Sequence, residues 1–218
     1  MLDFGLLTSA ITIVAVVAIT ARWATTPALG TRGVVNRLGG PVIAGVLAGR
    51  LAAAALDDPS SLRSVRALLV IRGGVEFWAG VAAAIGLLAW GLRRRREAPV
   101  ALTLAELVPF LLWGYATWEA TCLLRDGCYG PASTIGFVPD GLRSRQFPVG
   151  LLVAVAMTAL GVALRQLWGA PAWAKLIAAV TGVAAARSVA SIWLPRLSAD
   201  LTRQHVQSLA VLTACALP

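Results

Sequence analysis

Residues 118–130 read WEATCLLRDGCYG, and in this stretch a hydrophobic segment stops and a polar turn begins. Residues 111–124 are apolar except for Glu119 and a few small polar side chains, and an Arg-Asp pair and two glycines follow. Gly127 and Gly130 permit the positive φ values that a tight turn needs. The stretch therefore predicts a membrane helix that ends near one membrane surface, with a carboxylate, a thiol and an ion pair beside it.

The composition excludes a soluble domain. Hydrophobic residues make up 58% of the 218 residues, charged residues 13%, and the mean hydropathy is +0.79. Backbone in lipid must be hydrogen-bonded internally, and the long Ala, Leu and Val runs lack the alternation of barrel strands. We therefore predict an all-α integral membrane protein with about seven transmembrane helices, at about 20 residues per span. Residues 1–218 are expected to form a single domain.

Hydrophobic runs define the predicted spans. They cover residues 4–23, 41–56, 67–92, 102–124, 148–168, 173–193 and 204–217. Pro109 is expected to kink the fourth span, and residues 125–146 are expected to form an external loop rich in Gly, Pro and Asp. Alternation of Ala and Gly in residues 44–55 and 79–86 predicts helices that approach one another closely.

Arginines set the predicted orientation. Residues 93–96 are four consecutive arginines, and together with Arg22, Arg32 and Arg37 they predict cytoplasmic loops, an external N-terminus and a cytoplasmic C-terminus. In a membrane protein, a net charge of +9 more often reflects orientation and headgroup contact than nucleic-acid binding, and we expect no nucleic-acid partner. No basic segment precedes the first apolar run, so a cleaved signal peptide is not expected.

Polar residues inside the apolar runs are the candidate functional residues, because charge at membrane depth is costly. Arg50, in the middle of the second span, either faces a polar cavity, a partner or a lipid phosphate, or pairs with a carboxylate inside the bundle. Arg72, Gly73 and Gly74 interrupt the third span next to Glu76. Such a break is tolerated only where the backbone is buried or lines a cavity.

The opening stretch leaves two questions. Glu119 and Arg125 form either a rewired polar site or a simple ion pair at a helix end. Cys122 and Cys128 can pair if the helix ends between them, and they are either redox-active or merely small, partly buried side chains. The chain has one histidine, His205, which is expected at the membrane interface, so no zinc or haem site and no cofactor are predicted.

The order of short motifs along the chain resembles the prolipoprotein diacylglyceryl transferase family. The matching pieces cover nearly the whole chain and are FGLL at Phe4, AGVLAGRL at Ala44, IRGGVEFWAG at Ile71, AELVP at Ala105, CLLRDGCYG at Cys122, RQFP at Arg145, AARSVAS at Ala185 and LTRQHVQSL at Leu201. The resemblance implies a seven-helix protein of the bacterial cytoplasmic (inner) membrane. Members of this family transfer a diacylglyceryl group from phosphatidylglycerol to a lipobox cysteine, which requires a cationic cradle for the displaced phosphate and a means of forming a thiolate.

Several positions keep the charge or shape that the family has. Arg50 matches an arginine, Gly73 and Gly74 a glycine pair, Glu106 an aspartate, and Arg187 a late arginine regarded as essential. The resemblance implies a phosphate-binding role for Arg50 and Arg187 and a structural role for Gly73 and Gly74. Together with Arg72 at the helix break, Arg50 and Arg187 are the candidate lipid-phosphate-binding residues, and Gly127 and Gly130 join Gly73 and Gly74 as candidate turn residues.

Other positions depart from the family. The replacements are Phe4 for a tyrosine, Trp78 for a histidine, Glu119 for the signature arginine, Cys122 for an asparagine, Gly127 for a glutamate, Pro148 for a tyrosine and Ser191 for a glutamate. Glu119 reverses a charge beside a phosphate site, which turns attraction into repulsion. Loss of the histidine also removes a side chain suited to proton transfer near neutral pH.

These departures predict a diverged, non-catalytic member of the family. It would serve as a structural or phospholipid-binding subunit, with phosphatidylglycerol and other membrane-protein subunits as partners. The alternative is an active diacylglyceryl transferase with a rewired site, for which Arg187, Glu76 and Glu119 are the candidate catalytic residues. A small transporter is a weaker hypothesis, because inverted repeats are lacking.

Overall fold

The computed structural model describes residues 4–23, 30–63, 75–95, 99–125, 128–139, 142–166, 169–193 and 202–216. In these ranges the chain is mostly helical. The helices are α1 (Phe4–Trp23), α2 (Gly30–Asp57), α4 (Phe77–Arg95), α5 (Val100–Ala120), α6 (Val149–Gln166), α7 (Ala172–Ala190) and α8 (Arg203–Ala216). Short 3₁₀ segments are η1 (Pro59–Arg63) and η2 (Thr121–Arg125), and the two strands are β1 (Tyr129–Phe137) and β2 (Gln146–Pro148).

The described helices follow the predicted hydrophobic runs with differences at their ends, and residues 67–74 of the predicted third span lie outside the described residues. Within the described ranges, four segments are long and apolar enough to cross a membrane, namely residues 33–57, 100–124, 149–166 and 172–190. The second helix begins at Gly30 rather than at the predicted Pro41, which lies inside α2. An internal proline is tolerated in a membrane helix because neighbouring groups can satisfy the freed carbonyl. The count of seven spans stays a prediction.

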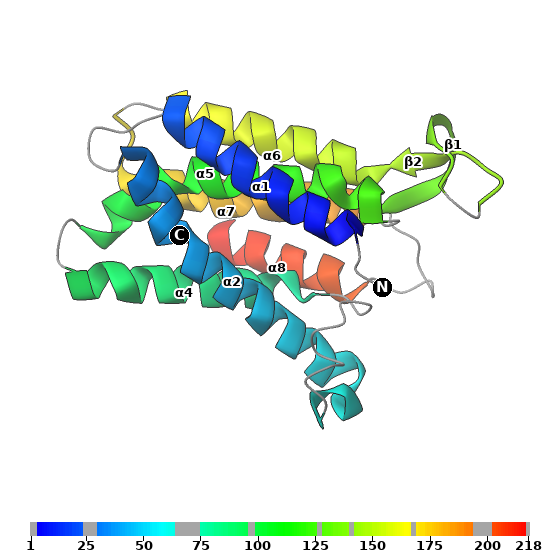
Figure 1. The fold of residues 1–218 in the computed structure, drawn as a ribbon, viewed down its shortest axis with the longest axis horizontal. Coiled ribbons are helices and arrows are strands. Elements are labelled where there is room, and N and C mark those ends of the chain that lie inside the picture. Colours follow the sequence, from blue (N-terminus) through cyan, green and yellow to red (C-terminus); the bar gives the residue numbers. More distant parts are fainter. Residues whose placement is uncertain are drawn as a thin grey trace. The chain divides into compact units, whose positions relative to one another are not determined.

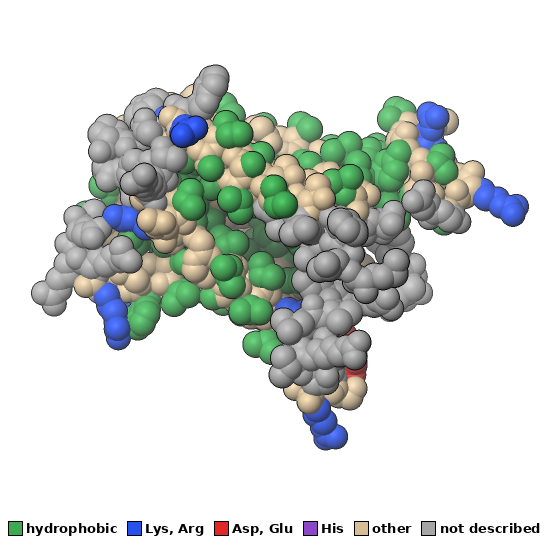
Figure 2. Space-filling model, viewed as in Figure 1, with side chains coloured by type: hydrophobic (Ala, Val, Ile, Leu, Met, Phe, Trp, Pro, Cys, Tyr) green, Lys and Arg blue, Asp and Glu red, His purple; other side chains and the backbone are tan. Residues whose placement is uncertain are grey.

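The outer surfaces of the helices are apolar. Exposed aliphatic side chains lie along α1, α2 and α6, and Val14, Ile43 and Val155 are 62%, 63% and 68% exposed. In Figure 2, hydrophobic side chains cover much of the visible helical surface, whereas lysines and arginines lie near helix ends and on the β-hairpin. Water would disfavour such continuous apolar surfaces, and lipid accommodates them. The protein is therefore embedded in a membrane.

The described chain divides into two compact units. Unit 1 comprises Met1–Ala28 and Leu104–Pro218, and unit 2 comprises Leu29–Thr103. In unit 2, α2 packs on α4 through small residues. A Cβ added to Gly45 would lie 2.7 Å from the carbonyl oxygen of Gly80, and one added to Gly49 would lie 2.8 Å from the carbonyl oxygen of Glu76. The predicted close approach of these two helices is confirmed.

Unit 1 is built on the packing of α5, α6 and α7, with α8 against α7 (Figure 1). Leu112 and Ala116 of α5, Val153 and Met157 of α6, and Ala179 of α7 belong to one buried cluster. Gly161 lets α6 approach Trp113 of α5, since a Cβ there would lie 2.6 Å from the indole nitrogen. These contacts bring the ends of α5 and α7 and the start of α8 together.

The predicted external loop contains an antiparallel β-hairpin, so its description as a plain loop was wrong. Tyr129 pairs with Pro148 and Ala132 with Gln146, with irregular register between the pairs. In Figure 1 the hairpin extends beyond the ends of α5 and α6 within unit 1. Gly and Pro signalled turns correctly, but cross-strand pairing depends on two segments meeting, which their composition alone does not reveal.

Gly49→Ala should destabilise the protein, whereas Gly39→Ala should not. Both residues lie in α2, but a Cβ at Gly49 meets backbone and Val75 at under 3 Å, and a Cβ at Gly39 meets nothing within 4 Å. Overpacking costs about 1–3 kcal/mol, whereas alanine gains up to about 1 kcal/mol of helix propensity. Thermal unfolding in detergent would measure both. Equal melting temperatures for the two variants would contradict the close packing.

Candidate functional site

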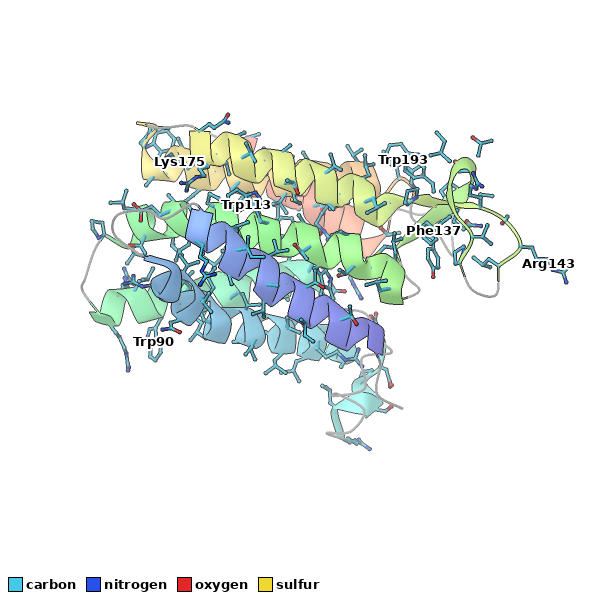
Figure 3. All side chains as sticks on the ribbon, turned by 45° about the horizontal axis from the view of Figure 1, so that its top comes forward. Trp90, Trp113, Phe137, Arg143, Lys175 and Trp193 are labelled. Carbon is cyan, nitrogen blue, oxygen red and sulfur yellow. A yellow bond between two sulfur atoms is a disulfide. The ribbon has the colours of Figure 1, made fainter. Side chains whose placement is uncertain are left out.

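A largely buried ion pair joins α5 and α7 at the hairpin end of unit 1. Arg187 lies in the last turn of α7 and Glu119 near the end of α5, with Arg187 Nη1 3.7 Å from Glu119 Oε1. Their side chains are only 14% and 13% exposed. Figure 3 shows Phe137 and Trp193 at this end of unit 1 and Lys175 at the opposite end. A charge among apolar helices needs such a partner, because its desolvation is otherwise uncompensated.

Two more side chains hold the guanidinium. Arg187 Nη1 also donates a hydrogen bond to the Tyr115 hydroxyl, and Arg187 Nη2 donates to Gln204 Oε1 at 3.1 Å. Tyr115 lies one turn before Glu119 on α5, so both project from the same helix face. We call Tyr115, Glu119, Arg187 and Gln204 the Arg187 cluster. It connects α5, α7 and α8 through one cation.

Beside this cluster, Ser191 and His205 are in contact. Ser191 follows α7 and is buried, and its Oγ donates to the Ser188 carbonyl at 2.7 Å and hydrogen-bonds with His205 Nδ1. A hydroxyl has one hydrogen, so when Ser191 donates to Ser188, His205 must donate to Ser191. A catalytic serine instead gives its proton to the histidine. This arrangement fastens the start of α8 to the end of α7.

A disulfide between Cys122 and Cys128 closes the turn that follows α5. The Cα atoms are 5.9 Å apart, and α5 ends at Ala120, before Cys122. The pairing that the sequence left open is present, but α5 ends before both cysteines, and it is the 3₁₀ segment η2 that ends between them, at Arg125. Cys128 Sγ lies 3.9 Å from Glu119 Oε2, so the disulfide touches the Arg187 cluster.

The backbone geometry of this turn differs from the prediction. Cys128 has a φ of 60°, and Gly130 is not among the described residues with positive φ. Gly130 is instead needed for close packing, since a Cβ there would lie 2.9 Å from Val149 and 3.2 Å from Phe147. Gly150 is similar, because a Cβ there would lie 2.7 Å from the Glu119 carbonyl oxygen. The prediction of positive φ at Gly130 was therefore wrong, although glycine is required there.

The other predicted site residues that the structure describes belong to unit 2. Arg50 is half-buried in α2, and the buried Glu76 precedes α4, so both belong to unit 2. The Glu76 N–H donates to the Gly49 carbonyl at 3.0 Å, which brings its backbone next to the α2 turn that carries Arg50. Arg72, Gly73, Gly74 and Gly127, together with the side chain of Arg125, lie outside the described residues.

Sequence reasoning selected Glu119 and Arg187 separately but did not pair them. It missed Tyr115 and Gln204, and it did not foresee the contact between Ser191 and His205. The spacing of Tyr115 and Glu119, four residues apart on a helix, was the one available signal. Nothing in the sequence near Glu119 indicated that Arg187 of α7 and Gln204 of α8 would join the same cluster.

No family model matches the sequence, and no curated protein matches it. The resemblance to diacylglyceryl transferases stays a prediction from short motifs in the sequence.

Removing one member of this largely buried ion pair should destabilise unit 1. Arg187→Gln leaves Glu119 as an unpaired buried carboxylate, and Glu119→Gln leaves Arg187 without its counter-charge. Each should lower the free energy of unfolding by about 3 kcal/mol. The double variant should recover part of that loss, because neither unpaired charge remains.

Unfolding in detergent, followed by circular dichroism, would measure this double-mutant cycle. Glu106→Gln is the matched control, since Glu106 lies on α5 near its other end. Strictly additive losses in the double variant would show that the two charges do not interact.

Proposed function

We propose that this protein is a diverged, non-catalytic relative of the prolipoprotein diacylglyceryl transferases. In this proposal it serves as a structural subunit of a larger assembly in a bacterial cytoplasmic membrane and contacts phosphatidylglycerol. One observation carries the proposal. Arg187, which the resemblance assigns to the substrate phosphate, is engaged by Glu119, Tyr115 and Gln204.

The contacts of Arg187 make it unsuited to stabilise the negative charge of a substrate phosphate. A transferase must stabilise negative charge on the displaced phosphate, and a guanidinium does so when its donors are available. Here the adjacent carboxylate of Glu119 neutralises the cation and would repel an approaching phosphate. The contact of Ser191 with His205 supplies no substitute, because the serine hydroxyl is buried and bonded to Ser188.

The same cluster supports a structural role. One arginine joins three helices, and the disulfide fastens the hairpin to the end of α5. In this proposal Arg50 and Arg72 bind the lipid phosphate, and Arg187 stabilises the packing of α5, α7 and α8. The outward apolar surfaces of α1, α2 and α6 are available to lipid or to neighbouring membrane subunits.

Complementation tests the absence of catalysis. In a strain depleted of its diacylglyceryl transferase, this protein should fail to restore lipoprotein modification, although it reaches the membrane at the level of an active control enzyme. Rescue that is lost in Arg187→Gln would establish the alternative, an active transferase with a rewired site.

Purification in mild detergent should also yield fixed stoichiometric partner subunits, and a protein that purifies alone would count against the assembly.

The proposed orientation, with an external N-terminus and a cytoplasmic C-terminus, is tested by labelling. The hairpin end carries the disulfide, and disulfides persist in oxidising compartments, which favours an external hairpin. In a Cys215→Ser background, Arg143→Cys should react with a membrane-impermeant maleimide in spheroplasts. Lys175→Cys, at the other end of unit 1, should react only after permeabilisation (Figure 3). The reverse pattern would invert the orientation.

A further inference from the structure

The disulfide has surroundings that a purely structural cross-link does not need. Cys122 is buried, whereas Cys128 is half-buried and so is the more accessible cysteine of the pair. The Glu119 carboxylate approaches this same residue, with Oε2 3.9 Å from Cys128 Sγ. A disulfide sulfur carries no hydrogen, so this contact can become a hydrogen bond only when Cys128 is a thiol.

Two features of the backbone favour reduction. The cysteines are separated by only 6 positions, and a short loop gains little from cross-linking because its closure removes little entropy from the unfolded chain. Cys128 also has a φ of 60°, in the left-handed region that non-glycine residues seldom occupy. Opening the disulfide would allow this residue to relax.

The carboxylate nearest to Cys128 is paired with a cation. An attacking thiolate would be repelled by Glu119 alone, but Arg187 lies 3.7 Å from the other carboxylate oxygen and balances its charge. The first turn of the α6 helix packs against the disulfide turn. The Gly150 N–H donates to the Cys128 carbonyl at 3.4 Å, and a Cβ at Gly150 would lie 3.2 Å and 3.5 Å from the Cβ atoms of Cys128 and Cys122.

We propose that Cys122–Cys128 is a thiol–disulfide exchange site for a dithiol protein, with Cys128 as the sulfur that is attacked. The inference does not depend on the proposed function. A partner thiolate forms a bond to Cys128 Sγ while the bond to Cys122 breaks, and Cys122 leaves with the electron pair and takes a proton from water.

The partner's second thiolate then attacks the partner's own bound sulfur. Cys128 leaves with its electron pair, takes a proton and donates a hydrogen bond to Glu119 Oε2. The protein gains two electrons and two protons in all, and the partner is oxidised to a disulfide. Glu119 stabilises the reduced state, since only that state offers it the additional donor.

A redox titration tests the role of Glu119. The full chain with Cys215→Ser, in phosphatidylethanolamine–phosphatidylglycerol nanodiscs, is equilibrated with reduced and oxidised dithiothreitol, and the free thiols are counted with a maleimide. The pair should reach equilibrium while the helical circular dichroism is unchanged. Glu119→Gln should lower the equilibrium constant for reduction about five-fold, as loss of one such hydrogen bond would, and Glu106→Gln should leave it unchanged. Reduction only after unfolding, or equal effects of both variants, would overturn the proposal.

Mixed-disulfide trapping tests the attacked sulfur and needs no Glu119 variant. The same chain is mixed with a Cys-x-x-Cys oxidoreductase whose second active-site cysteine is replaced by serine, and the reaction is stopped with acid. Peptide mapping should place the covalent adduct on Cys128. An adduct on Cys122, or no adduct under conditions in which dithiothreitol reduces the pair, would refute exchange at Cys128 with a protein partner.

Discussion

A positive charge among apolar helices requires a nearby negative charge, and the pairing of Arg187 with Glu119 meets this requirement in unit 1. The guanidinium also binds Tyr115 and Gln204, so the Arg187 side chain connects α7 to both α5 and α8. Apolar packing has little directional preference in lipid, where hydrocarbon surrounds every helix. Directional contacts of this kind define which helix faces meet and in what register.

The same requirement constrains the chemistry at this end of the protein. A cation that stabilises the helix packing by binding a carboxylate is poorly placed to stabilise a phosphate, because both tasks use the same donors and the same charge. Ser191 and His205 follow this pattern, since their hydrogen bonds close the junction of α7 and α8. Two of the three candidate catalytic residues, Arg187 and Glu119, thus bind each other.

The disulfide turn is the place where this polar network reaches the hairpin. Glu119 contacts Arg187 with one oxygen and approaches Cys128 with the other, so the charge pair and the cysteine pair share a carboxylate. Close approach at Gly130 and Gly150 allows the strands and the start of α6 to pack around this turn. Reduction of the cysteines would therefore change the contact between Cys128 and Glu119 directly.

Hydrophobicity and local spacing determined much of this protein from its sequence alone: the membrane environment, the positions of most described helices and the Gly-mediated approach of α2 to α4, whereas the pairing of Cys122 with Cys128 was only a possibility. These features depend on residues close together in the chain or on the average character of a segment. The hairpin in residues 129–148, the start of α2 before Pro41, and the positive φ at Cys128 were not predicted. Only the tertiary structure decided that Glu119 meets Arg187, because an ion pair depends on the distance between side chains on separate helices, and helix packing sets that distance.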